Sequence, residues 1–321
     1  MSYRLEPDEG VRAGILRTAG EQLDAALHAL NDEMSDDPVK AVHAARKAVK
    51  KERSLLRLTR GALPAKRRRA ENAALRRAAR GLSDARDAEV MVQTLDQLAQ
   101  RFAGQLPEHS FEAVRERLER DRDAHRAQLA DSAAVPQAAG QLAGARARID
   151  SWQLRSGGWP ALGPGLERSY RRGRRAMRDA ERQRSAEHMH AWRKRVKDLW
   201  YHERFLAPVG GPAIGGQAKD LHRLADVLGD HHDLGVLRGR LTDDPPHVAA
   251  DVDGIIGLIG HRQAELEGQA LSLGSRIYAE KPGAFVRRMR SAWQAGRALR
   301  SGADQPRPAE LAQATRAHAA D

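Results

Sequence analysis

The chain has 321 residues, enough for two domains or for one duplicated domain with a sizeable core. Its 55 lysines and arginines outnumber its 43 aspartates and glutamates, and the net charge of +12 favours a polyanionic partner. The absence of cysteine excludes disulfides and thiolate chemistry. The N-terminal segment MSYRLEPDEG lacks the apolar stretch of a secretory signal, so we expect a cytoplasmic protein.

Helix is the expected structure nearly everywhere, because Ala, Leu, Arg and Glu dominate and aromatic residues make up only 4%. The first predicted helix has an apolar stripe from Ile15 to Leu30. A second runs from Pro38, a residue tolerated in a first turn, to about residue 60. Its expected buried stripe is Val42, Ala45, Val49 and Leu56.

Three further helices are expected in the first half of the chain. One follows Pro64, one is capped by Ser83 and Asp84, and one covers about 108–130. The Gly-, Ala- and Pro-rich stretch 131–165 is the best candidate for a boundary.

The second half repeats this succession of elements. Helices are expected over 165–185 and 187–207, followed by a break at Pro208 to Gly216. The next expected helix ends near Gly229, and two more cover 247–274 and 284–300. We therefore predict an all-α fold of antiparallel bundles formed by internal duplication, with one half at 1–145, the other at 146–300, and a disordered tail at 301–321.

A basic helix that begins with histidine occurs twice. HAARKAVK at His43 recurs 147 residues later as HAWRKRVK at His190, and seven of sixteen positions match through Leu58 and Phe205. At about 100° per residue, each copy places its basic residues on one helix face. The predicted polyanion-binding stripes are His43, Arg46, Lys47, Lys50 and Arg57 in the first copy, and His190, Arg193, Lys194, Lys197, Tyr201 and Arg204 in the second.

A second motif repeats at nearly the same offset. LSDARDAEVM, which begins at Leu82, corresponds to LGDHHDLGVL, which begins at Leu228. Its aspartates, including Asp230 and Asp233, are expected at a helix start, where carboxylates cap free N–H groups. Two motifs in one register indicate duplication of a whole unit.

These segments together resemble the CHAD domain family, the conserved-histidine α-helical domain. The resemblance rests on HAARKAVKKERSLLRL, HAWRKRVKDLWYHERFL, the paired LSDARDAEVM and LADVLGDHHDLGVL segments, and the late stretch from Ile277 to Arg288. It covers about residues 10–300 and implies two pseudo-symmetric bundles whose basic helices face a central groove or pore. It also implies binding of inorganic polyphosphate without a cofactor, a function compatible with targeting to polyphosphate granules.

The family's basic positions correspond to residues of both stripes: His43, Arg46, Lys50 and Arg57, and His190, Arg193, Lys197 and Arg204. Some relatives also carry a CYTH triphosphatase domain, whose strand pattern this sequence lacks, so the resemblance implies no catalytic activity. The two copies differ at Ser54, which corresponds to Tyr201, and need not contribute equally.

Polyphosphate offers only oxygen acceptors, which suits the paired N–H groups of arginine. Arg171, Arg175 and Arg178 are expected to extend the site from a neighbouring helix, and Arg76, Arg77, Arg80 and the run from Lys66 to Arg69 are further candidates. Histidine protonation should make affinity rise as pH falls from about 8 to 6.

A general nucleic-acid-binding module is the main alternative, although only Tyr201 is placed to stack on a base. A histidine-based metal site at Asp230 to Asp233 is weaker, because adjacent histidines point about 100° apart and the stripe histidines lie among cations. We expect no metal, no membrane association and nucleic acid only as a weak competitor. The oligomeric state is left open.

Overall fold

The computed structural model describes residues 3–82, 85–130, 133–243 and 252–303. These residues form ten α-helices and one short 3-10 turn, with no strand among them. The elements are α1 (Val11–Asn31), α2 (Pro38–Leu58), η1 (Thr59–Gly61), α3 (Ala65–Arg80), α4 (Ala85–Arg101), α5 (Glu108–Ala130), α6 (Ala134–Ile149), α7 (Gly158–Arg182), α8 (Ala186–Asp243), α9 (Val252–Ile277) and α10 (Pro282–Ala303).

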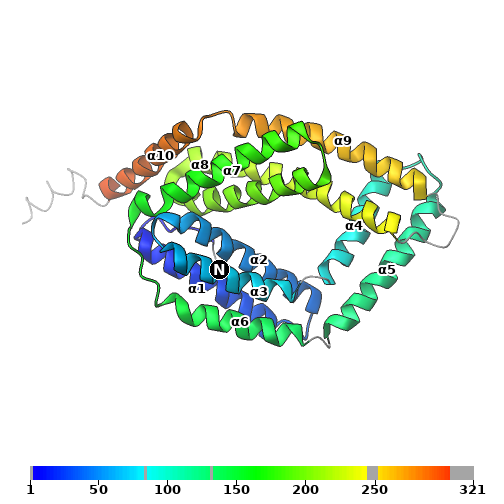
Figure 1. The fold of residues 1–321 in the computed structure, drawn as a ribbon, viewed down its shortest axis with the longest axis horizontal. Helices are drawn as coiled ribbons and strands as arrows, with labels where there is room; N and C mark the ends of the chain where they lie inside the picture. The colour runs from blue at the N-terminus through cyan, green and yellow to red at the C-terminus, as the bar shows by residue number, and fades with distance from the viewer. Residues whose placement is uncertain (1–2, 83–84, 131–132, 244–251, 304–321) are drawn as a thin grey trace, which may run out of the picture.

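The helices form a body and an arm, each with its own hydrophobic core. The body contains α1, α2, α3, α6, α7 and α10, together with the first part of α8 and the end of α9. In the arm, α4 and α5 pack against the end of α8 and the start of α9. Figure 1 shows the arm on the right, with α8 and α9 reaching from the body into it.

The predicted helical periodicity of α1 and α2 is confirmed. The apolar stripes from Ile15 to Leu30 and from Val42 to Leu56 are buried. Proline stands at the start of α2, and the Asp37 side chain caps this end by accepting a hydrogen bond from the Lys40 N–H at 3.1 Å. Because the basic face flanks the apolar stripe on the same helix, burial of the stripe determines the direction in which the basic face of α2 points.

Helix α8 departs from expectation in two places. The predicted break is a sharp kink at Gly211, whose φ of 64° is readily adopted only by glycine. The helix then continues past Gly229 to Asp243, so Asp230 and Asp233 lie inside it. The prediction that these two aspartates cap a helix start is therefore wrong.

The stretch 131–165, expected to hold a boundary, contains α6 (Ala134–Ile149), which packs on α1 and α3. The expected cap at Ser83 and Asp84 lies outside the described residues, as does the expected tail 301–321 except for residues 301–303, which belong to α10.

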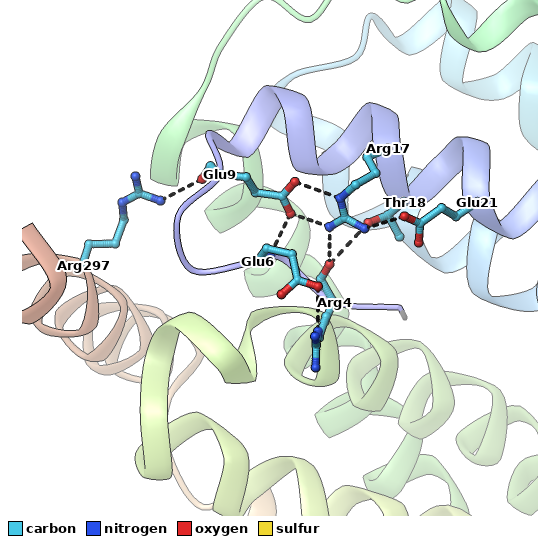
Figure 2. Close-up of polar contacts among 7 residues, drawn as sticks. All are labelled: Arg4, Glu6, Glu9, Arg17, Thr18, Glu21 and Arg297. Carbon is cyan, nitrogen blue, oxygen red and sulfur yellow. Dashed lines mark hydrogen bonds and ion pairs between the residues drawn. The ribbon is translucent and has the colours of Figure 1, made fainter. Parts of the chain in front are cut away.

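A network of polar contacts around Arg17 fastens the N-terminal segment to the body (Figure 2). Arg17 Nε donates to Glu9 Oε2 at 2.9 Å, and its other nitrogens donate to the Arg4 carbonyl at 2.9 Å and to Glu21 at 3.0 Å. The Glu9 carbonyl accepts from Arg297 of α10 at 3.2 Å. Burial alone would raise the pKa of Glu9, but the hydrogen bonds and charge of Arg17, together with the hydrogen bond from the Glu6 N–H, outweigh it and the pKa is lowered. Segments from both ends of the described chain meet at this network.

Replacing Arg17 with methionine should lower the free energy of unfolding by about 2 kcal/mol, because hydrogen bonds to charged groups contribute about 1.5–3 kcal/mol. Urea denaturation followed by circular dichroism measures this change. The matched control is Arg223→Met, on an exposed arginine with no hydrogen bond to any other described residue, which should stay within about 0.5 kcal/mol of the parent. Equal stability of the two variants would contradict the role assigned to the network.

Candidate anion-binding site

A basic pocket of about 650 Å³, called here the main pocket, lies between α2 and α8 and is also lined from α3 and α4. Its charged lining consists of nine lysines and arginines and two aspartates. These residues are Arg46, Lys50, Arg53, Arg57, Arg76, Arg193, Lys194, Arg195, Lys197, Asp198 and Asp233. His190, Tyr201 and His232 complete the polar part, and Val90, Met91 and Val236 supply apolar surface.

Eight of the predicted stripe residues line this pocket. They are Arg46, Lys50 and Arg57 on α2, and His190, Arg193, Lys194, Lys197 and Tyr201 on α8. His43, Lys47 and Arg204 are not among the lining residues. Lys47 and Arg204 instead lie near Lys51, where burial first and then these two cations lower the pKa of that amine to about 8.

The α2 residues that line the pocket differ from the predicted stripe for a simple geometric reason. The lining residues Arg46, Lys50, Arg53 and Arg57 follow one another at intervals of four, three and four. At about 100° per residue, their mean direction is rotated by about 35° from that of the predicted stripe. This rotation brings Arg53 into the pocket and moves Lys47 out of it.

Asp198 is a carboxylate that the sequence analysis did not place in the site. Its Oδ1 contacts Arg57 Nη1 at 3.2 Å and its Oδ2 contacts Arg195 Nη1 at 3.3 Å. Burial raises the pKa of Asp198, although the surrounding arginines oppose this effect. The Asp198 carbonyl accepts from the Ser54 hydroxyl at 3.2 Å, and His202 Nε2 donates to the Ser54 carbonyl at 2.9 Å. These contacts lock α2 against α8 beside the pocket.

Two histidines of the main pocket stack on each other. The rings of His190 and His232 lie 4.1 Å apart with an interplanar angle of 28°. Burial lowers the pKa of His190 to about 4, with further lowering by the facing His232 ring and by Lys194 and Arg193. Burial also lowers the pKa of His232 to about 4, assisted by Arg193, Lys194, the adjacent His231 and Lys197. Both rings are therefore neutral near pH 7.

The neighbouring His231 points away from the pocket, toward Glu267 of α9 at 3.1 Å. The two adjacent histidines thus face different surroundings, as expected on a helix. Among the described residues, no group of three or more histidine, aspartate or glutamate side chains is arranged to hold a metal ion.

Tyr201 is less accessible than expected for a stacking residue. Its side chain is only 7% exposed, with ring centroids 5.7 Å from Tyr3 and 4.6 Å from Trp200. Trp192 is fully buried, and Trp200 is half-buried. The prediction that Tyr201 can stack on a base is not supported by this packing.

The three arginines expected to extend the site from α7 lie elsewhere. Arg171, Arg175 and Arg178 line a separate shallow pocket of about 310 Å³ together with Arg174, Arg182, Asp179 and Pro282. Arg171 pairs with Glu167 of its own helix, and Arg175 lies 3.7 Å from Asp179. The part of α7 nearest to α2 carries Arg168 and Arg172 instead.

Fold and site together define an all-helical protein with a strongly basic pocket between two histidine-containing helices. The chain belongs to the CHAD domain family, which matches residues 17–242.

Two solved structures share the fold. PptA from Streptomyces chartreusis superposes with a TM-score of 0.60 at 14% identity and covers 85% of this chain and 100% of its own. The CHAD domain from the plant Ricinus communis gives a TM-score of 0.58 at 18% identity and covers 87% of this chain and 95% of its own. Among curated proteins, no sequence matches this chain significantly. None of the described helices is both long and apolar enough to cross a membrane.

Proposed function

We propose that this CHAD domain protein binds inorganic polyphosphate in the main pocket and does not catalyse its turnover. The observation that carries the proposal is the pocket lining, in which nine lysines and arginines face two carboxylates. Arginine forks match phosphate oxygens, and lysines add positive charge along a flexible chain. Asp198 is engaged by two arginines, so it serves to position cations rather than to hold magnesium for phosphoryl transfer.

We further propose that the pocket arises from duplication of one helical unit. The first copy, within residues 1–145, contributes the α2 cations, and the second, within 146–300, contributes those at the start of α8. Ser54 and Tyr201, which correspond in the two copies, play different parts: Ser54 is fully buried, whereas Tyr201 borders the pocket. The two copies thus supply similar cations to one groove but different packing residues.

General nucleic-acid binding is the second candidate function. Single-strand binders combine cations with exposed aromatic rings on which bases stack. Tyr201 is the one Phe, Tyr or Trp side chain lining the described pocket, and its burial favours a ligand without bases.

The deciding experiment is a competition titration of fluorescently labelled long-chain polyphosphate against single-stranded DNA at physiological salt. The proposal expects polyphosphate to bind at least a hundredfold more tightly. Equal competition by DNA would overturn the proposal and favour a general polyanion surface.

The pH dependence of binding should differ from the sequence-based expectation. A bound polyanion favours the imidazolium form and so raises the pKa values of His190 and His232 above their free-state values of about 4. Protons are then taken up on binding, and affinity rises as pH falls through the bound-state pKa values. We expect less than about a twofold change between pH 8 and 7 and a clear rise below pH 6.

Long chains are the appropriate ligand for this titration, because their titrating end groups are few. Replacing both His190 and His232 with glutamine should flatten the profile below pH 6. A tenfold rise between pH 8 and 7 that survives in this variant would assign the proton linkage to other groups.

A further inference from the structure

A second pocket, called here the arginine pocket, lies where α2, α3, α7 and α8 meet. It has a volume of about 210 Å³, a third of that of the main pocket, and its charged lining comprises seven arginines and one aspartate. Arg57, Arg195 and Asp198 line both pockets, so the two spaces adjoin at this ion-paired trio.

The other five arginines of this pocket are short of negative charge. Arg60, Arg68, Arg69, Arg168 and Arg172 form no ion pair within 4.0 Å with any acidic side chain that the structure describes. The Nε of Arg68 is buried without a hydrogen-bond acceptor in the described part of the chain. Burial and neighbouring arginines lower the pKa values of Arg68 and Arg172. Solvent partly screens their mutual repulsion, because all of them except Arg68 are exposed, and an anion bound among them would relieve the rest.

The shape of the cluster indicates what this anion is. Arginines converge from three sides, since Arg60 follows α2, Arg68 and Arg69 lie on α3, and Arg168 and Arg172 lie on α7. Planar guanidinium forks arranged around a small space suit a tetrahedral oxyanion, whose several oxygens accept hydrogen bonds in different directions. The small volume favours one or two phosphate groups over an extended chain.

We propose that the arginine pocket is a separate site for a compact phosphate group. Its occupant is free orthophosphate or diphosphate, or the terminal group of a polyphosphate whose following units lie in the main pocket. The inference rests on the proposed function only in the choice of phosphate as the oxyanion. If a chain end is the occupant, the protein recognises the terminal phosphate group of a polyphosphate as well as the negative charge of the chain.

The test is isothermal titration of the full chain with diphosphate. Two double variants remove exposed arginines from opposite sides of the pocket: Arg168→Gln with Arg172→Gln, and Arg60→Gln with Arg69→Gln. The matched control is Arg223→Gln with Arg276→Gln, on exposed arginines of α8 and α9 that line none of the described pockets. We expect each pocket variant to weaken diphosphate binding at least tenfold and the control to change it less than twofold. Unchanged binding in the pocket variants, or an equal loss in the control, would overturn the inference.

Two further titrations identify the occupant and separate this inference from the proposed function. If the site holds chain ends, a short polyphosphate with chemically blocked ends should bind the parent protein more weakly than the unblocked chain does. The pocket variants should bind the two chains equally. Equal binding of the two chains, with diphosphate binding retained, assigns the site to the free anion. A parent protein that binds diphosphate in this pocket but no long chain would contradict the proposed function and leave the inference standing.

Discussion

Changing Arg46, Lys50, Arg193 and Lys197 together to glutamate is expected to weaken long-chain polyphosphate binding at least a hundredfold, a loss of about 3 kcal/mol. Two of these residues come from α2 and two from α8, and all four line the main pocket. Each reversal replaces an attraction with a repulsion, at about 1 kcal/mol or more per site. Arg46 also donates to the Leu82 carbonyl at 3.1 Å, so the helical content and thermal midpoint of the variant should be measured alongside binding.

A matched control separates the pocket from the overall charge of the protein. Glutamate at Lys219, Arg223, Arg238 and Arg276 removes the same charge from exposed positions that line none of the described pockets. This variant should lose less than about tenfold in affinity, because its exposed charges do not line the pocket and are screened by water and salt. Equal losses in both folded variants would show that net charge, not the pocket, determines binding.

Salt should weaken polyphosphate binding steeply. Each phosphate neutralised on a flexible single strand contributes about 0.7 to the slope of log affinity against log salt, and we apply that value to polyphosphate. Six contacts in the main pocket then give a slope of about −4, which corresponds to a loss of about 300-fold between 50 and 200 mM salt.

The salt series also counts contacts in variants. Lys50→Gln should reduce the magnitude of the slope by about 0.7, because it removes one phosphate contact, whereas Lys219→Gln should leave the slope unchanged. A parent slope shallower than about −2 would mean that too few cations of the pocket touch the chain for this account.

Sequence periodicity was sufficient to predict α1 and α2 and their buried faces, but not α6 or the full length of α8. The apolar stripes of α1 and α2 are strongly periodic, and packing requires that these residues face inward. The Pro208 to Gly216 segment was expected to end a helix, but only Gly211 leaves helical geometry there. A glycine with positive φ lets the chain turn sharply and begin a new helical segment at once, which local composition alone does not distinguish from a loop.

The site was only half predictable, because a pocket depends on how helices are rotated against one another. Arg53 and Lys47 lie on opposite edges of the basic face, and the packing of α2 decides which of them lines the pocket. Asp198 and His232 meet the cationic stripe through contacts between distant segments, for which a single sequence carries no signal. The α7 arginines show the same limit, since the structure brings Arg168 and Arg172 to α2 and leaves Arg171 and Arg175 outside.

The central claim is that both copies of the basic helix hold one polyphosphate chain in one pocket. Isothermal titration of two single-copy variants tests it most directly: Arg46→Glu with Lys50→Glu in α2, and Arg193→Glu with Lys197→Glu in α8. The account predicts that each variant loses at least tenfold in affinity for long-chain polyphosphate, and that neither retains a site of parental strength. A variant that keeps parental affinity at half the parental stoichiometry would show two independent sites and would contradict the account.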